Sequence, residues 1–188
     1  MKKTAWLSLL ILLMGAAHPP ESELKQVRSA AGALLTQLQS TLKAALQSQG
    51  PAAAVEVCHQ VAPGIAAQIA ETEGVEIRRV SLRSRNPQNQ PDAYEQKVLE
   101  QWSQNPTAIP EEHFEVVQEG QKQVLRYLKP LKIQAVCLQC HGPAEKIKPE
   151  VQALLKKYYP QDQATGYHEG DLRGAVTVRH VLTLEPQL

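Results

Sequence analysis

Cys137-Leu138-Gln139-Cys140-His141 has the form Cys-x-x-Cys-His and is the most informative stretch of the chain. Two thiols at this spacing can each add to one vinyl group of a haem, and the resulting thioethers tie the macrocycle to the backbone. His141 follows directly and is expected to bind the haem iron as the proximal axial ligand. The pentapeptide therefore predicts one covalently attached haem c.

Three other roles of a Cys-x-x-Cys pair fit this sequence less well. A thioredoxin-like redox pair is expected after the first strand of its fold, whereas this pair lies far down the chain. A four-ligand zinc site needs a second pair of ligands, and neither Cys-x-x-Cys nor His-x3-His recurs. A disulfide between Cys137 and Cys140 would leave the adjoining His141 without a role.

The N-terminus has the pattern of a secretory signal peptide. Lys2 and Lys3 precede an apolar run over residues 5–14, and small residues follow at positions 15–17. The apolar run is short for a transmembrane span, so we expect cleavage after Ala17, with an uncleaved N-terminal anchor as the alternative. Residues 18–188 would then form one periplasmic haem c-binding domain, in the compartment where covalent haem attachment takes place.

Composition excludes two classes of partner. Without Lys2 and Lys3 the chain has 18 basic and 19 acidic side chains, a net charge of about −1, so neither nucleic acid nor an anionic membrane is an expected partner. Three cysteines in an oxidising compartment are too few for a disulfide framework. Two of the three belong to the motif, which leaves Cys58 single.

Apolar periodicity predicts several helices. A long amphipathic helix is expected over residues 21–47, ended by Gly50-Pro51, with an Ala-rich helix over residues 52–60 behind it. A third helix would run from Pro63 to near Gly74. Two more are indicated by a capping box at Asp92 and Glu95 and by Pro149.

Strands are expected over residues 75–82, 114–117, 123–127 and 175–182, with a turn at Gly120. The apolar alternation slips between Ile77 and Val80, which suggests a β-bulge. Because the helices and strands do not alternate as βαβ units, we predict an α+β domain with an antiparallel sheet. The order also argues against an all-helical small cytochrome, in which the motif lies near the N-terminus.

The second axial position of the iron cannot be filled by a methionine of the mature chain, because Met1 and Met14 both lie in the predicted signal peptide. Cys58 is the most informative candidate, since a thiolate donates charge to iron and favours the ferric state. Its alternative role is that of a small buried apolar side chain. Four histidines are further candidates: His59, His180, His113 and His168. His59 points about 100° away from Cys58 on a helix, His180 lies on the apolar face of the last strand, and the other two lie in polar stretches where we expect them to be solvated. A lysine, a tyrosine or an open site are the remaining alternatives.

Arginines in and before the polar loop at residues 83–91 could hold the haem propionates. Arg83 and Arg85 are the principal candidates, with Arg78 and Arg79 just before them. Their guanidinium groups can donate charge-assisted hydrogen bonds to carboxylates. The alternative for each is a solvated basic edge.

The Glu-x-Cys sequence of the helix that carries Cys58, the loop Arg85-Asn86-Pro87-Gln88-Asn89 and the haem motif follow one another in a specific order. Ala62-Pro63, residues 77–82, Pro91-Asp92 and residues 170–174 keep to the same order. Over residues 25–182 the chain resembles a family of periplasmic single-haem c-type proteins with a PAS-like fold, described as a domain of unknown function. The resemblance implies a PAS-like antiparallel sheet and an iron bound by His141 and Cys58.

The motif and the resemblance leave three functions open. The first is low-potential electron transfer or redox sensing, which we expect. The second is a haem-based sensor in which release of the Cys58 thiolate lets a gas such as NO or CO bind, with output through a partner protein because the sequence lacks the signalling domain of fused members. The third is a peroxidase-type enzyme, against which a ligated Cys58 would argue.

Overall fold

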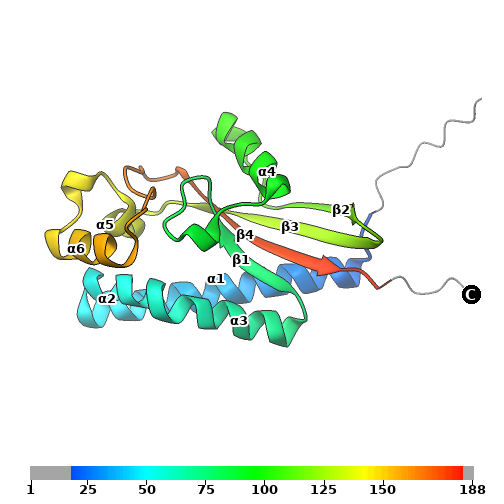
Figure 1. Ribbon diagram of the computed structural model, residues 1–188, viewed down its shortest axis with the longest axis horizontal. Coiled ribbons are helices and arrows are strands. Elements are labelled where there is room, and N and C mark those ends of the chain that lie inside the picture. The colour runs from blue at the N-terminus through cyan, green and yellow to red at the C-terminus, as the bar shows by residue number, and fades with distance from the viewer. Residues whose placement is uncertain (1–17, 184–188) are drawn as a thin grey trace, which may run out of the picture.

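The computed structural model describes residues 18–183, so the predicted signal peptide at residues 1–17 lies outside the described part of the chain. Its strands are β1 (Glu76–Val80), β2 (His113–Glu119), β3 (Lys122–Lys132) and β4 (Leu172–Val181). They form one antiparallel sheet in the order β1-β4-β3-β2, with helices against both faces (Figure 1). The predicted α+β class, with a long N-terminal helix and an antiparallel sheet, is confirmed.

The first helix, α1 (Glu21–Gln49), runs beneath the sheet (Figure 1). From Leu24 to Leu34 its buried residues follow the predicted spacing of three or four positions, and they pack against apolar side chains of β1, β3 and β4. The helix ends where Gly50 adopts a φ of 82°, a left-handed conformation that glycine reaches without steric cost. Pro51 then opens the next helix.

A π-helical turn joins the two helices that the sequence predicted on either side of Pro63. The segment consists of α2 (Pro51–Glu56), the π-turn η1 (Val57–Val61) and α3 (Ala62–Glu73). Proline cannot donate a backbone hydrogen bond and its ring disturbs the preceding turn. The wider turn, in which Ala62 N–H donates to Val57 O, accommodates this break. Cys58 and His59 therefore lie on a π-turn, a feature that apolar periodicity does not reveal.

The predicted bulge in β1 is wrong, because the pairing of β1 with β4 is continuous from Glu76 to Val80. Ile77 packs in the core beneath the sheet, with α1 and α3, whereas Val80 packs above it, with α4. A strand covered on both faces needs apolar residues on both, so strict alternation is lost without a bulge. The irregularity of the sheet lies instead between Leu131 and Lys132, just before the haem motif.

The helix α4 (Ala93–Gln104) covers the upper face of the sheet (Figure 1). The predicted capping box is present, with the Asp92 side chain accepting from Glu95 N–H and the Glu95 carboxylate accepting from Asp92 N–H. The buried Glu95 also accepts hydrogen bonds from Arg78, Arg126 and Thr177 of the sheet. The hairpin predicted at Gly120 is also present, between β2 and β3.

The haem motif occupies one end of the molecule, on the left in Figure 1, beside α2. This end contains α5 (Leu138–His141), α6 (Pro149–Tyr158) and the loop over residues 159–171. Short 3-10 turns complete the fold at Pro87–Asn89, Pro106–Ala108, Ala135–Cys137 and Ala144–Lys146. Among residues 18–183, no helix is both long enough and apolar enough to cross a bilayer.

Candidate functional site

Gly142 fixes the backbone immediately after the motif. Its N–H donates to the Leu138 carbonyl at 3.0 Å and so closes the single turn of α5. A β carbon at position 142 would lie 2.6 Å from that same carbonyl oxygen, closer than real β carbons approach any atom. Glycine is therefore required by close packing at the point where the chain leaves His141.

His141 is held in one tautomer by the loop that follows α6. Its Nδ1 lies 2.7 Å from the carbonyl oxygen of Ala164. Because a carbonyl oxygen can only accept a hydrogen bond, Nδ1 carries the proton and Nε2 carries the free lone pair. Burial holds the pKa of His141 well below its usual range, and the charges of Arg85 and Arg173 act in the same direction. A neutral imidazole with a free Nε2 is the form that binds a metal.

Arg85 connects the motif to the same loop. Its Nη2 donates to the Cys140 carbonyl at 2.5 Å and to the Ala164 carbonyl at 3.1 Å, and its Nε donates to Asp162 Oδ2 at 2.9 Å. The side chain is almost fully buried. In this structure Arg85 is thus engaged by protein groups, and its predicted contact with a propionate stays a prediction.

The two motif cysteines are free thiols in apolar surroundings. Cys140 packs against a cluster that contains Val55 and Tyr159, and Cys137 packs against Ile133 and Tyr167. Burial raises the pKa of Cys140 to about 11, with the positive charge of Arg85 opposing the rise. Cys140 is therefore a neutral thiol at physiological pH.

Cys58 reaches the same end of the molecule from η1. Cys58 lies three residues after Val55 of α2, and Val55 packs in one apolar cluster with Cys140 and Tyr159. The structure thus brings Cys58, Cys140 and His141 into one region. Within residues 18–183, however, no three His, Cys, Asp or Glu side chains form a compact set for a bare metal ion.

The donor set fits a haem better than a zinc ion. Zinc in a structural site takes four protein donors arranged around one centre. A haem c takes two thiols at its edge and one or two axial donors at its iron. Two thiols, one neutral imidazole and a further thiol nearby match the second requirement.

Three arginines act on His141 through their charge, whereas Arg78 points elsewhere. The charges of Arg79, Arg85 and Arg173 all lower the pKa of His141. Arg79 has no hydrogen-bond or ion-pair partner within the described part of the chain, which leaves its guanidinium available to a ligand. Arg78 lies on the other face of the sheet, where it donates to Gln90 O and Glu95, so its predicted contact with a propionate is not supported by its position.

Arg83 lies at the rim of the site and is exposed. Its Nε donates to the Gln163 carbonyl at 3.1 Å, and Nη2 donates to the Thr165 carbonyl. Its guanidinium also stacks over the Tyr167 ring at 4.2 Å. Its contact with a propionate stays a prediction.

The remaining histidines face other parts of the molecule. His59 is exposed and stacks on Tyr158, with 4.3 Å between ring centroids. His180 Nε2 lies 2.5 Å from Glu23, at the start of α1. His113 is half-buried and hydrogen-bonded to the Tyr94 hydroxyl at 3.0 Å, so its predicted solvation is wrong, whereas His168 is exposed as predicted.

Sequence reasoning missed the contribution of the loop over residues 159–171 and of the first residues of β4. Ala164 supplies a main-chain carbonyl, Asp162 a carboxylate and Arg173 a half-buried guanidinium that donates to Ser81 Oγ at 2.7 Å. Such a loop has no apolar periodicity, and a main-chain acceptor leaves no residue-type signal. The available signal was the glycine-rich sequence after α6, with glycines at positions 166, 170 and 174.

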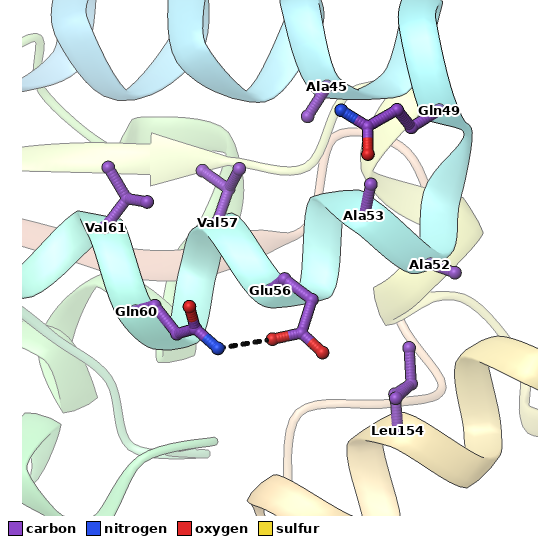
Figure 2. A pocket seen from close by; sticks show the side chains of 9 residues that line it. All are labelled: Ala45, Gln49, Ala52, Ala53, Glu56, Val57, Gln60, Val61 and Leu154. Atoms are coloured by element: carbon purple, nitrogen blue, oxygen red, sulfur yellow. Dashed lines mark hydrogen bonds between the residues drawn. The ribbon is translucent and has the colours of Figure 1, made fainter.

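A surface groove of about 490 Å³ adjoins the site between the end of α1, α2–η1 and α6 (Figure 2). Glu56 accepts from Gln60 Nε2 at 2.8 Å within it and from the Tyr158 hydroxyl at 2.5 Å, which ties α6 to α2. None of the predicted iron or thioether residues lines this groove. Its lining residues are Ala45, Gln49, Ala52, Ala53, Glu56, Val57, Gln60, Val61 and Leu154.

The Tll0287-like family (Tll0287) matches residues 20–180 of this chain. The chain belongs to the Tll0287-like family. The fold is similar to a solved structure described as "Crystal structure of the cyanobacterial heme-protein Tll0287", with 26% sequence identity and a TM-score of 0.61. The similarity covers 90% of this chain and 99% of that one. No curated protein sequence matches this chain.

Proposed function

We propose that this chain is a periplasmic haem c protein that acts in low-potential electron transfer or redox sensing. Membership of the Tll0287-like family supports haem binding, because the solved relative is described as a haem protein. The Cys-x-x-Cys-His motif supports covalent attachment of one haem through Cys137 and Cys140. A PAS-like classification of the antiparallel sheet and export by the signal peptide at residues 1–17 belong to the same proposal.

The tautomer of His141 carries the proposal. The Ala164 carbonyl holds Nδ1–H and leaves Nε2 without a hydrogen bond among residues 18–183, on the residue that directly follows the second motif cysteine. When bound, the haem supplies an iron that gains or loses one electron. The residues of the chain would hold that iron, His141 through Nε2 on one side and Cys58 of η1 on the other.

With haem bound, each motif thiol would add across one vinyl double bond: a carbon–sulfur bond would form and the thiol hydrogen would go to the neighbouring carbon. Arg79 supports binding of a propionate because its charge acts on His141 and it has no hydrogen-bond or ion-pair partner among residues 18–183. Arg83 and Arg85 can also approach propionates, Arg83 from the rim and Arg85 through its Nη1. Charge-assisted hydrogen bonds of this kind orient the macrocycle.

A haem-based gas sensor is the second candidate, and the π-turn favours it. Cys58 lies on η1, and π-turns occur frequently at functional sites because their hydrogen bonding departs from the regular α-helical pattern. For a gas to bind, the Cys58 thiolate would have to leave the iron. A gas such as NO or CO would then take the distal position, and a protein partner would read out the change.

Expression of the full chain in a bacterium with c-type haem maturation tests the proposal. We expect one haem per chain that resists acid–acetone extraction, measured by pyridine haemochrome spectra and by intact mass. Cys137→Ser and Cys140→Ser should each lose one thioether, which shifts the haemochrome band, whereas the matched control Cys58→Ser should keep both. Absence of covalent haem from the wild-type chain, or acid-resistant haem in the double variant of Cys137 and Cys140, would overturn it.

A further inference from the structure

Arg85 and Asp162 form a buried ion pair directly behind the proximal histidine. The side chains are 9% and 11% exposed, and Arg85 Nε lies 2.9 Å from Asp162 Oδ2. The other oxygen of Asp162 accepts from the Ala164 N–H at 2.7 Å. A buried guanidinium at this site would be costly without its carboxylate, so the two residues act as a unit.

The pair meets His141 at a single atom, the carbonyl oxygen of Ala164. That oxygen accepts from His141 Nδ1–H at 2.7 Å and from Arg85 Nη2 at 3.1 Å. A carbonyl oxygen has two lone pairs and can accept both bonds. The positive charge of Arg85 draws electron density from the oxygen, which weakens it as an acceptor for His141, while Asp162 offsets part of that charge.

The strength of the Nδ1–H bond matters because it controls how well Nε2 donates to a metal. A stronger bond to the second ring nitrogen raises the basicity of a ligating histidine. A more basic axial ligand stabilises the ferric state and lowers the reduction potential, and a nearby positive charge has the opposite effect. Arg85 therefore raises the reduction potential both by weakening the Nδ1–H bond and by its positive charge, and Asp162 lowers the potential by opposing both effects.

We propose that Arg85 and Asp162 are positioning residues that set the reduction potential of a haem bound at His141, by tuning the hydrogen bond between His141 Nδ1–H and the Ala164 carbonyl. This inference rests on the proposed haem function. It assigns Arg85 a role different from propionate binding, since Nε and Nη2 are engaged by Asp162, Ala164 and Cys140. The same contacts fix the position of the motif relative to the loop.

The test compares the midpoint potentials of haem-loaded variants with that of the wild-type protein. Arg85→Gln should lower the potential, Asp162→Asn should raise it, and the double variant should lie between the two. Arg179→Gln is a matched control: it removes an arginine that is ion-paired with Glu76 and Glu119, away from the motif, and should leave the potential unchanged. If the Arg85–Asp162 pair had a purely structural role, the two single variants would not shift the midpoint potential in opposite directions.

A second readout reports on His141 itself. In the Cys58→Ala background, where His141 would be the proximal ligand of a five-coordinate ferrous iron, resonance Raman spectroscopy gives the iron–histidine stretching frequency. A stronger Nδ1–H bond should raise that frequency in Arg85→Gln and a weaker one should lower it in Asp162→Asn.

Potential shifts of the same sign in both variants, or no shift in either, would overturn the inference. The proposed function would still stand in that case, provided that the wild-type protein carries haem. If Arg85→Gln does not fold, Asp162→Asn decides alone: a raised potential supports the inference and an unchanged potential overturns it. A wild-type chain without haem would instead be a failure of the proposed function.

Discussion

Gly142 connects the haem motif to the rest of the chain through a contact that leaves no room for a side chain. Replacement by alanine would place a β carbon 2.6 Å from the Leu138 carbonyl oxygen, so α5 or the following loop must shift. We expect Gly142→Ala to lower the free energy of unfolding by about 1–3 kcal/mol, the usual cost of overpacking. Urea denaturation followed by circular dichroism measures the change.

Gly32→Ala is the matched control for Gly142→Ala. Gly32 lies inside α1, and a β carbon there would meet nothing within 4 Å. Alanine forms helices better than glycine, so this variant should gain up to about 1 kcal/mol of stability. Equal effects of the two substitutions would contradict the tight turn at Gly142.

At the level of single residues, the sequence predicted the chemistry of the motif but not its surroundings. The roles proposed for Cys137, Cys140 and His141 follow from residue order and spacing alone. The acceptor of His141 could not, because Ala164 contributes a main-chain oxygen from a loop 23 positions away. Arg85 was recognised as a site residue, but its partners depend on how that loop folds back.

The helix α4 is attached to the sheet through a buried carboxylate. Glu95 is 2% exposed and accepts hydrogen bonds from Arg78, Arg126 and Thr177 of three different strands. Glu95→Gln leaves buried arginine without part of its counter-charge, and we expect a loss of about 3 kcal/mol in the free energy of unfolding. Chemical denaturation at neutral pH provides the measurement.

Glu100→Gln provides the comparison on the same helix. Glu100 is exposed and bonds only to Gln96 among the described residues, so its replacement should change stability by less than about 0.5 kcal/mol. A similar loss in both variants would mean that general helix charge, rather than the buried network, holds α4 in place.

Among the elements, α1, α4 and the hairpin at Gly120 were predicted correctly because helix caps, turn glycines and regular apolar spacing are local signals. The π-turn was not predicted, since it differs from an α-helical turn by one hydrogen-bond register. The slip in β1 was seen but misinterpreted as a bulge. The slip arises because helices cover both faces of the sheet. This packing joins residues far apart in the sequence, so a local pattern does not reveal it.

The whole domain should lose stability in acid. Glu112 and Glu119 have pKa values below their ordinary value of 4.5, chiefly through hydrogen bonds from Arg28 and Arg179 respectively. Because the unfolded chain takes up these protons at a higher pH than the folded one, their contribution is present above pH 4.5 and is lost as the pH falls through the lowered folded values. The urea concentration at the denaturation midpoint, measured between pH 7 and pH 3, should therefore fall as the pH drops below about 4.5.

Arg28→Gln should flatten the acid limb of that profile, because it removes the main cause of the lowered pKa of Glu112. Lys43→Gln is the matched control: Lys43 is exposed on the same helix and has no ion pair within residues 18–183. An acid limb that is unchanged in Arg28→Gln would show that other carboxylates govern the transition.

The ferric electron paramagnetic resonance spectrum of the haem-loaded protein, recorded beside that of Cys58→Ala, tests the central claim most directly. The proposed His141 and Cys58 ligation predicts a low-spin signal with the g values of a thiolate ligand, lost in the variant. The neighbouring variant His59→Ala should keep the wild-type signal, because the His59 ring is stacked on Tyr158. A Cys58→Ala spectrum identical to that of the wild type would contradict the account and move the distal position to another group.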